Sequence, residues 1–351
     1  MNHDRATLLR WLREDDPARI EELWREADEV RRRHVGDDVH LRGLVEVSNH
    51  CARQCAYCGI RAGNAAIGRY RMTADEVLDC ARRAVVLGFG TLVLQAGEDD
   101  VLTTGWVEDV VRRVKAATPL AVTLSLGERG EEELAAWREA GADRYLLRFE
   151  TSDAELYRRI HPPRPGRSDG DRFAILRALR RLGYEVGSGV MVGIPGQTLE
   201  SLADDLLAFR ALDLDMIGIG PFIPHPGTPL GEKLGTAPTF SLATEEMVCK
   251  MVALARLVRP DANIPATTAL ATLDPEHGRE TGLTRGANVV MPNLTSPAYR
   301  QLYEIYPGKA CVTETAEHCA FCLRGRIRSI GRTVGAGQGG RTHAAAHGGT
   351  A

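Results

Sequence analysis

Three cysteines stand close together in the first quarter of the chain and form the first candidate site. Cys51, Cys55 and Cys58 follow a C-x3-C-x2-C spacing in the stretch SNHCARQCAYCGI. A structural zinc ion takes four protein ligands and a disulfide takes two cysteines, so three cysteines suit neither. Thiolates at this spacing can bind one cubane-type iron–sulfur cluster and leave one iron open to a non-protein ligand. Zinc is the alternative, although His50 directly precedes Cys51 and joint chelation by these two neighbours is strained.

A second triad lies near the C-terminus. Cys311, Cys319 and Cys322 follow a C-x7-C-x2-C spacing. Short spacings of this kind in a reducing compartment indicate metal or redox chemistry rather than disulfides. The sequence leaves two options open, an iron–sulfur cluster and a zinc site assisted by His318. The remaining cysteines, Cys80 and Cys249, lie in segments with helical periodicity and are expected to be packing residues.

The rest of the chain alternates short apolar segments with longer helical patterns. Eight segments predict strands, at residues 41–47, 91–96, 120–126, 144–149, 185–193, 215–222, 262–268 and 287–292. Strands that alternate with helices predict parallel βαβ units, and eight such units predict an α/β protein with a complete (β/α)8 TIM-type barrel. An open doubly wound sheet is the alternative, but its G-x-G-x-x-G motif is missing after the first strand, where the cysteine loop stands. Segments 185–193 and 262–268 are weak strands because of their glycines and Pro265.

Unusual polar residues follow the ends of consecutive predicted strands. The first cysteine triad follows strand one, and the later strands end in AGEDD, SLGE, RFET, GIPGQT, PFIPHPGTP, TTA and MPN. Barrel enzymes build their active sites at the carboxyl ends of the strands, so we expect these residues to surround one site.

The remaining segments predict the domain boundaries, and the composition narrows the class of protein. Residues 1–40 predict an N-terminal helical extension, 41–300 the barrel, 301–330 a segment with the second triad, and 331–351 a disordered tail rich in glycine. The net charge of −3 and the scattered arginines argue against nucleic-acid binding. No apolar run approaches the ~20 residues that span a bilayer, and the N-terminus has no secretory signal pattern. We therefore expect a cytoplasmic protein that binds neither nucleic acid nor a membrane.

The first triad, with Tyr57 directly before its last cysteine, resembles the radical S-adenosylmethionine (SAM) superfamily. The resemblance implies a [4Fe–4S] cluster on Cys51, Cys55 and Cys58 whose open iron binds SAM, which is then cleaved reductively to a 5′-deoxyadenosyl radical. It also implies that Glu98 faces the SAM ammonium and Arg172 its carboxylate. The full set of implied SAM contacts is Tyr57, Gln95, Gly97, Glu98, Ser125, Glu150 and Arg172.

Longer stretches resemble one family of that superfamily, the HydE maturases of [FeFe]-hydrogenase, which are related to biotin synthase and methylornithine synthase. RYRMTADEV, EAGADRYLLRFET, LGYEVGSGVMVGIPGQT, MIGIGPFIPHPGTPL and YRQLYEIYPGKAC carry this resemblance, which covers roughly residues 40–325. It implies assembly of the dithiolate-bridged diiron part of the hydrogenase H-cluster, on an iron–carbonyl–cyanide–cysteine complex from a sister maturase. It also implies an accessory cluster, expected to be [2Fe–2S], on Cys311, Cys319 and Cys322.

The same resemblance implies a set of substrate contacts, at Arg148, Thr267, Thr268, Met291, Tyr303 and Tyr306. An interior of arginine, hydroxyls and tyrosines suits a small anionic substrate. A charge on a barrel strand is costly unless it has a function, which favours Arg148. Thr267 and Thr268 also fit plain barrel packing, and the tyrosines also fit a helix docking face.

Two other functions remain open at this stage. One is a radical SAM reaction on a small amino acid or a sulfur-insertion substrate, of the methylornithine synthase or biotin synthase type. The other is a non-enzymatic iron–sulfur scaffold or carrier, which the residues that resemble SAM ligands disfavour. The expected partners of the enzyme are a small-molecule substrate, partner maturases and a one-electron donor.

Overall fold

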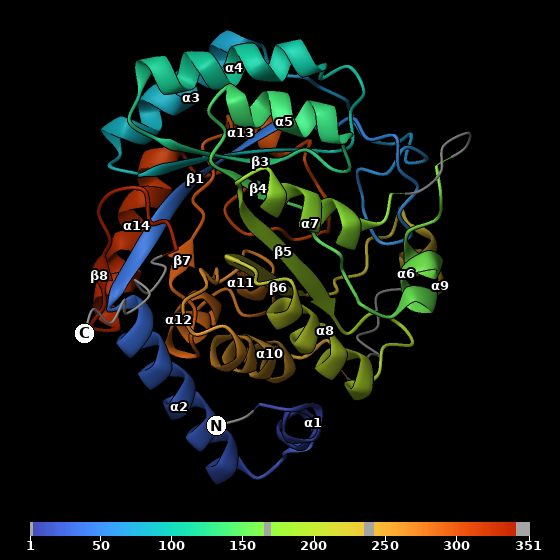
Figure 1. Cartoon of the computed structure of the whole chain (residues 1–351), viewed down its shortest axis with the longest axis vertical. Coiled ribbons are helices and arrows are strands. Elements are labelled where there is room, and N and C mark those ends of the chain that lie inside the picture. The colour runs from blue at the N-terminus through green and yellow to red at the C-terminus, as the bar shows by residue number, and fades with distance from the viewer. Residues whose placement is uncertain (1–2, 165–169, 235–241, 342–351) are drawn as a thin grey trace, which may run out of the picture.

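The computed structural model describes residues 3–164, 170–234 and 242–341. Its centre is a parallel sheet that curls round, with helices on the outside (Figure 1). The strands are β1 (Asp38–Ser48), β2 (Thr91–Ala96), β3 (Ala121–Ser125), β4 (Arg144–Leu146), β5 (Glu185–Val192), β6 (Met216–Pro221), β7 (Val289–Val290) and β8 (Thr333–Val334). The helices are α1 (Arg5–Arg13), α2 (Pro17–Val35), α3 (Ala74–Val86), α4 (Thr104–Ala117), α5 (Glu131–Glu139), α6 (Ala154–Ile160), α7 (Arg172–Arg181), α8 (Leu199–Ala211), α9 (Pro229–Leu234), α10 (Glu245–Val258), α11 (Leu270–Leu273), α12 (Gly278–Thr284), α13 (Pro297–Arg300) and α14 (Ala316–Ser329).

The sheet closes into the predicted (β/α)8 barrel. The hydrogen-bonded strand order is β6-β5-β4-β3-β2-β1-β7, and all pairs are parallel. Residues 263–265 complete the ring, since Asn263 bridges Met216 of β6 and Pro265 bridges Val289 of β7. This segment occupies the place of the seventh barrel strand. It makes single bridges rather than a ladder because Pro265 has no N–H to donate. The prediction of a complete barrel is therefore confirmed.

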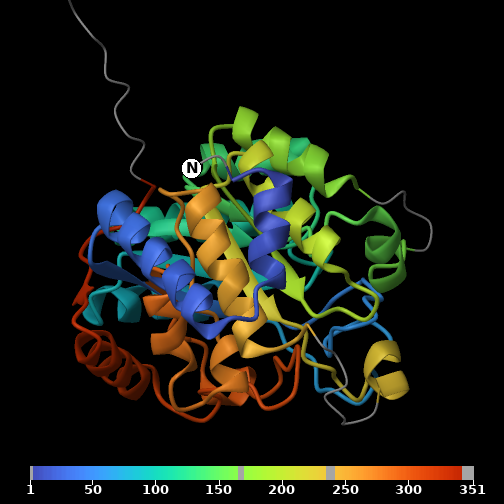
Figure 2. The ribbon, with the colours of Figure 1, turned by 90° about the horizontal axis from the view of Figure 1, so that it is seen from below.

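The helical layer follows from local sequence signals. Thr73 and Glu76 form a capping box that starts α3, and Thr244 accepts from the N–H of Met247 at the start of α10. Helix α10 is buried on every side from Met247 to Val258, because it lies between the barrel and the helices α2 and α8. Figure 2 shows α1 and α2, in blue, lying beside α10 as an outer layer. The N-terminal extension is thus part of the packed molecule.

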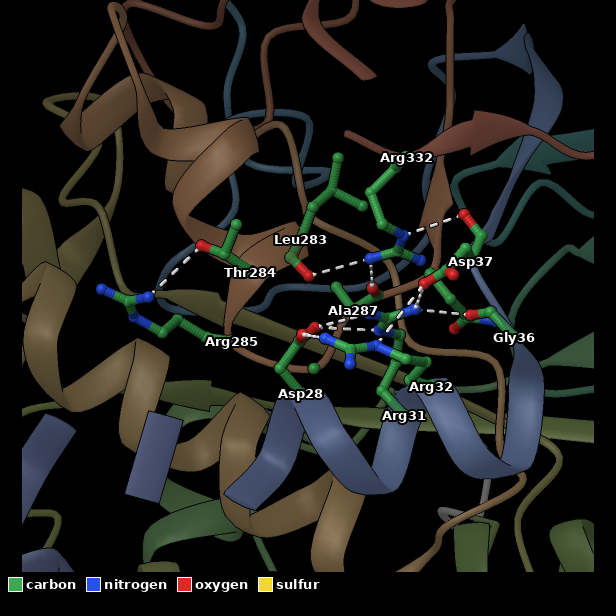
Figure 3. Close-up of polar contacts among 12 residues, drawn as sticks. Asp28, Arg31, Arg32, Gly36, Asp37, Leu283, Thr284, Arg285, Ala287 and Arg332 are labelled. Atoms are coloured by element: carbon green, nitrogen blue, oxygen red, sulfur yellow. Dashed lines mark hydrogen bonds and ion pairs between the residues drawn. The ribbon is translucent and has the colours of Figure 1, made fainter. Parts of the chain in front are cut away.

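Buried arginines attach this outer layer to the barrel (Figure 3). Arg31 of α2 is 1% exposed and donates to Asp28, to Asp37 and to the carbonyl of Gly36. Arg332 donates to the carbonyls of Asp37, Leu283 and Ala287. These guanidinium groups satisfy carbonyls at helix and loop ends that would otherwise be buried without a donor.

The C-terminal tail differs from the expected disorder over its described part. Strand β8 pairs with the start of β1, and the following residues contact side chains of β1, β2 and β4. The carbonyl of Gln338 accepts from Thr91 and Arg144, and the carbonyl of Gly339 accepts from Arg42. Arg341 then forms ion pairs with Asp213, Asp215 and Asp261. Residues 331–341 therefore form the floor of the barrel, and residues 342–351 lie outside the described residues.

We predict that Gly90→Ala displaces this floor. A Cβ at Gly90 would lie 1.6 Å from the carbonyl oxygen of Gly337, and all its nearest neighbours are tail backbone atoms. Overpacking of this kind lowers the free energy of unfolding by about 1–3 kcal/mol. Denaturant unfolding measures the loss, and hydrogen exchange of residues 333–341 should accelerate. Gly105→Ala is the matched control, because no atom lies within 4 Å of a Cβ there; equal behaviour of the two variants would contradict the prediction.

Candidate active site

A cavity of about 340 Å³ lies inside the barrel at the carboxyl ends of the strands. Thirteen of the residues expected from the sequence line it together: Cys51, Tyr57, Cys58, Gln95, Gly97, Ser125, Arg148, Glu150, Thr267, Thr268, Met291, Tyr303 and Tyr306. They come from the first to the last segment of the ring and from the loop after it. The closed barrel is what brings them together, because parallel strands all end at the same face.

The cysteine loop crosses the mouth of the barrel in contact with the end of β2. The N–H of Gly97 donates to the carbonyl of Ser48, and the N–H of Ala52 donates to the carbonyl of Glu98. A Cβ at Gly97 would lie 2.3 Å from the carbonyl oxygen of His50 and 2.7 Å from Cβ of Cys51. Only glycine allows this approach, so Gly97 fixes where the first cysteine stands relative to the cavity.

The three thiols of this loop suit a cluster chemically. All three cysteines are free, and Cys51 and Cys58 line the cavity while Cys55 lies buried behind them. Burial raises the pKa of Cys58 to about 12. Burial, together with the charges of Cys58 and Cys51, raises the pKa of Cys55 well above its usual value. Thiolates opposed by burial and by one another need a bound cationic centre, so the donor set fits an iron–sulfur cluster.

Glu98 and Arg172, the residues expected to face the SAM ammonium and carboxylate, lie beside the cavity and are not among the residues that line it. Glu98 pairs with Arg53 of the cysteine loop at 2.6 Å, and Arg172 pairs with Glu128 at 2.8 Å. Arg53 also pairs with Glu128, so the four side chains form one network, all less than 10% exposed. Inside a barrel wall a carboxylate pairs with the nearest guanidinium, and here the nearest one belongs to the cysteine loop.

His161 extends this network. Arg172 lies 2.6 Å from Nε2 of His161, whose other ring nitrogen lies 3.3 Å from the hydroxyl of Tyr157. Burial, followed by the charges of Arg172 and Arg53, lowers the pKa of His161 to about 2. The imidazole is therefore neutral and accepts from Arg172. The network supports the cysteine loop from outside the cavity.

Arg148 and Glu150 form an ion pair within the cavity wall. Nε of Arg148 donates to both carboxylate oxygens of Glu150 at 3.1 Å, and its Nη2 donates to the carbonyl of Val190. Glu150 has a φ of 63°, in the left-handed region, where a side chain with a Cβ is strained. Backbone bonds to Gly189 and Met191 hold that conformation. Strain at such a position is typical of functional sites.

Tyr303 and Tyr306 also line the cavity, together with residues that the sequence did not single out. Tyr303 accepts from Nε2 of Gln95 at 3.2 Å, and Thr267 donates to the carbonyl of Ile219. Arg42, Glu46, Asn263 and Lys309 also line the cavity. Arg42 and Glu46 could have been found from the sequence, because they are the charged residues of the predicted strand LRGLVEV and their even spacing places them on one face of it. No sequence pattern pointed to Lys309, since it lies in a segment without regular secondary structure.

The second triad lies outside the cavity, around the start of α14. A hydrogen bond from the Cys319 thiol lowers the pKa of Cys311 to about 6 and raises that of Cys319. Arg279 lies 4.0 Å from the Cys311 sulfur. Cys322 is exposed one turn after Cys319 on the same helix. Over the described ranges, no three His, Cys, Asp or Glu side chains converge on the position of a single metal ion.

Comparison with known proteins places this geometry in a family. The chain matches the Radical SAM superfamily over residues 45–208. The [FeFe] hydrogenase maturase subunit HydE of Thermotoga maritima is 50% identical over 322 residues, which cover 92% of this chain and 89% of that protein. The chain belongs to the HydE family of radical SAM enzymes. Its cofactors are therefore a [4Fe–4S] cluster and SAM.

Two further matches agree with the assignment of the chain to the HydE family. The 3-methylornithine synthase of Methanosarcina acetivorans is 31% identical over 280 residues, covering 79% of this chain and 75% of that protein. The crystal structure of methylornithine synthase (PylB) matches with a TM-score of 0.79 and 26% identity, and 95% of each chain is covered. The barrel fold is therefore shared with HydE's relatives. Among the described helices, none combines the length and apolarity that a bilayer crossing requires.

We predict that Arg172→Met destabilises this HydE-family protein strongly. The substitution leaves a cluster of buried carboxylates, Glu98 and Glu128, with Arg53 as their remaining close guanidinium partner. Removal of one member of a buried ion pair lowers the free energy of unfolding by about 3 kcal/mol or more. Denaturant unfolding under anaerobic conditions measures it. Arg33→Ala, at an exposed pair with Glu29, is the control and should change stability by less than about 1 kcal/mol; equal losses would refute the assignment.

Proposed function

We propose that the protein binds SAM at a [4Fe–4S] cluster beside the barrel cavity and acts in assembly of the [FeFe]-hydrogenase H-cluster. The observation that carries this proposal is the convergence of thirteen expected residues on one cavity with Cys51 and Cys58 in its wall. The 50% identity to a HydE maturase subunit supports the choice of pathway. The barrel wall surrounds the cavity and limits its contact with bulk water, which favours a radical reaction.

Each wall of the cavity has a role in this proposal. Cys51, Cys55 and Cys58 hold the cluster, which, with SAM bound, supplies one-electron cleavage of the sulfonium and a 5′-deoxyadenosyl radical. Tyr57, Gln95, Gly97, Ser125 and Glu150 contact SAM. Glu98 and Arg172, implied contacts of the SAM ammonium and carboxylate, also support the cysteine loop, Glu98 through Arg53 and Arg172 through Glu128.

The substrate in this proposal is a small sulfur- or cysteine-containing molecule bound to iron, and the radical acts at sulfur. Arg148, Thr267, Thr268, Met291, Tyr303 and Tyr306 contact it. The cavity volume of about 340 Å³ suits a small molecule, and cationic and hydroxyl groups suit one with anionic groups. A sister maturase supplies this substrate and a one-electron donor reduces the cluster, in the cytoplasm.

A second candidate is a radical SAM reaction on a small amino acid. The observation in its favour is the TM-score of 0.79 with PylB, a methylornithine synthase, together with the 31% identity to a 3-methylornithine synthase. The 50% identity to HydE over nearly the whole chain favours the maturase function. A scaffold that only carries a cluster is disfavoured by the cavity beside the cysteine loop, because cluster delivery needs no small-molecule site.

We predict that Cys55→Ser abolishes SAM cleavage. Loss of one of three thiolates removes the cluster, since no fourth cysteine of the loop can replace it. In the wild type, anaerobic reconstitution should give an electron paramagnetic resonance signal that changes when SAM is added, and reduction should release 5′-deoxyadenosine. Cys80→Ser, a cysteine outside both triads, should behave as the wild type. A wild-type signal unchanged by SAM would refute the proposed function.

We further propose that Cys311, Cys319 and Cys322 bind an accessory [2Fe–2S] cluster with a structural or redox role. The contact between the Cys311 and Cys319 thiols supports it, together with Cys322 one turn further along the same helix. Cys311→Ser is predicted to remove a second iron–sulfur signal and the matching iron content while SAM cleavage persists. An unchanged signal and iron content would refute the accessory cluster, and zinc in place of iron would refute its assigned type.

A further inference from the structure

His225 stands in the middle of PFIPHPGTP, the stretch at the end of β6, and it has a fixed place behind the cavity wall. It is 5% exposed and is not among the residues that line the cavity. Its carbonyl accepts from the N–H and from the hydroxyl of Thr228, at 3.1 and 2.8 Å. A Cβ at Gly231 would lie 1.8 Å from the same carbonyl oxygen, so only glycine fits there. The backbone therefore gives the imidazole one location.

Both ring nitrogens of His225 have partners. Nδ1 lies 3.0 Å from the backbone nitrogen of Gly227 and accepts its hydrogen. The ring hydrogen therefore lies on Nε2, which donates to Oε1 of Glu304 at 3.1 Å. A pair of bonds of this kind fixes the tautomer and the orientation of the ring. The side chain of Glu304 is 48% exposed, so water still solvates its charge.

The imidazole also lies against the cysteine loop, at Gly59, the residue that follows Cys58. A Cβ at Gly59 would lie 2.6 Å from Cδ2 and from Nε2 of His225, and 2.2 Å from the carbonyl oxygen of Glu304. The N–H of Gly59 donates to the carbonyl of Ile305 at 2.9 Å. The cysteine loop and the segment around Glu304 therefore meet at one point, and His225 contacts both of them there.

Four residues of the cavity wall flank these two contact points: Cys58 and Ile60 beside Gly59, and Tyr303 and Ile305 beside Glu304. Gly59 and Glu304 are not among the lining residues. In the proposed function, Cys58 holds the cluster and Tyr303 contacts the substrate. A change at His225 is expected to alter the spacing between Cys58 and Tyr303, because both of their segments rest on the same ring.

We propose that His225 is a positioning residue for the radical reaction. It holds the cysteine loop and the tyrosine segment (residues 303–306) at one spacing, and so sets where Cys58 stands relative to Tyr303. The inference rests on the proposed function, because it concerns the geometry of that same site. His225 does not touch the reactants, so its effect passes through Gly59 and Glu304. A misplacement of about 1 Å between reacting groups can lower a rate by ~10²-fold, so a small shift is measurable.

The test uses the reconstituted, reduced protein and two readouts. They are the electron paramagnetic resonance spectrum with and without SAM, and the rate of 5′-deoxyadenosine release at saturating SAM. Two variants break the same bond from opposite sides: His225→Phe, which keeps a ring against Gly59, and Glu304→Leu. Both should bind as much iron as the wild type, show an altered spectrum once SAM is added, and release 5′-deoxyadenosine about tenfold more slowly. Glu304 is half exposed, so Glu304→Leu tests the inference even where His225→Phe does not fold.

Conservative variants separate positioning from mere stabilisation. His225→Gln keeps an N–H donor and Glu304→Gln keeps an acceptor, so both should remain within about threefold of the wild-type rate. The double variant His225→Phe with Glu304→Leu should lose little more than either single variant, because both act through one bond. Glu276→Leu is the matched control, since Glu276 forms an exposed pair with His277 and does not line the cavity.

A stabilising role alone would lower the midpoint of unfolding and leave both readouts of the folded variants at their wild-type values. A wild-type spectrum with SAM, or a wild-type rate, in Glu304→Leu therefore overturns the inference, as do additive losses in the double variant. The proposed function is judged separately on the wild type. If SAM changes the wild-type spectrum and the variants behave alike, the inference fails and the radical SAM function stands. If SAM leaves the wild-type spectrum unchanged, the proposed function fails and the inference falls with it.

Discussion

Charged side chains inside a closed barrel need partners, because the interior offers little water to solvate them. Five such residues line this cavity: Arg42, Glu46, Arg148, Glu150 and Lys309. Two pairs neutralise four of them, Arg148 with Glu150 and Lys309 with Glu46. The left-handed backbone at Glu150 and the inward path of the segment around Lys309 both bring a charge to its partner. Much of the irregular structure around the cavity thus follows from the pairing of these charges.

Arg42 is the fifth charge, and it explains the C-terminal floor. Its side chain donates to the carbonyl of Gly339 and to the sulfur of Met216, and burial lowers its pKa to about 9. Backbone carbonyls solvate a guanidinium without adding a carboxylate, so the cavity keeps the cation available. Glycines let the tail approach closely, since a Cβ at Gly339 would meet the ring of His40 at 2.5 Å. The glycine-rich tail is therefore shaped by the barrel floor that it covers.

The sequence predicted the location of the site better than the contacts of the C-terminal tail. The strand ends located most of the site, because parallel strands in a ring share one mouth and each quoted motif sits at such an end. The spacing of Cys51, Cys55 and Cys58 was enough to predict that they act together, and a glycine at position 97 fits the close approach of the cysteine loop. The tail was predicted wrongly over residues 331–341, since its contacts are made largely by backbone carbonyls and composition describes only side chains. The network of Glu98 and Arg172 with Arg53 and Glu128 was not predicted, because a carboxylate pairs with whichever guanidinium the fold brings close and strand order alone does not give that distance.

The same reasoning bears on how a barrel shared with amino-acid enzymes can serve a maturase. The fold and the cysteine loop are common to HydE and to methylornithine synthase, so neither distinguishes their substrates. Distinction must come from the side chains that face the cavity between the loop and the floor. In this chain those side chains form two ion pairs and a single cation, Arg42, which donates to one carbonyl and to a methionine sulfur. Groups of both charges therefore line one cavity, and their arrangement, not the shared fold, must distinguish the ligand that this chain takes.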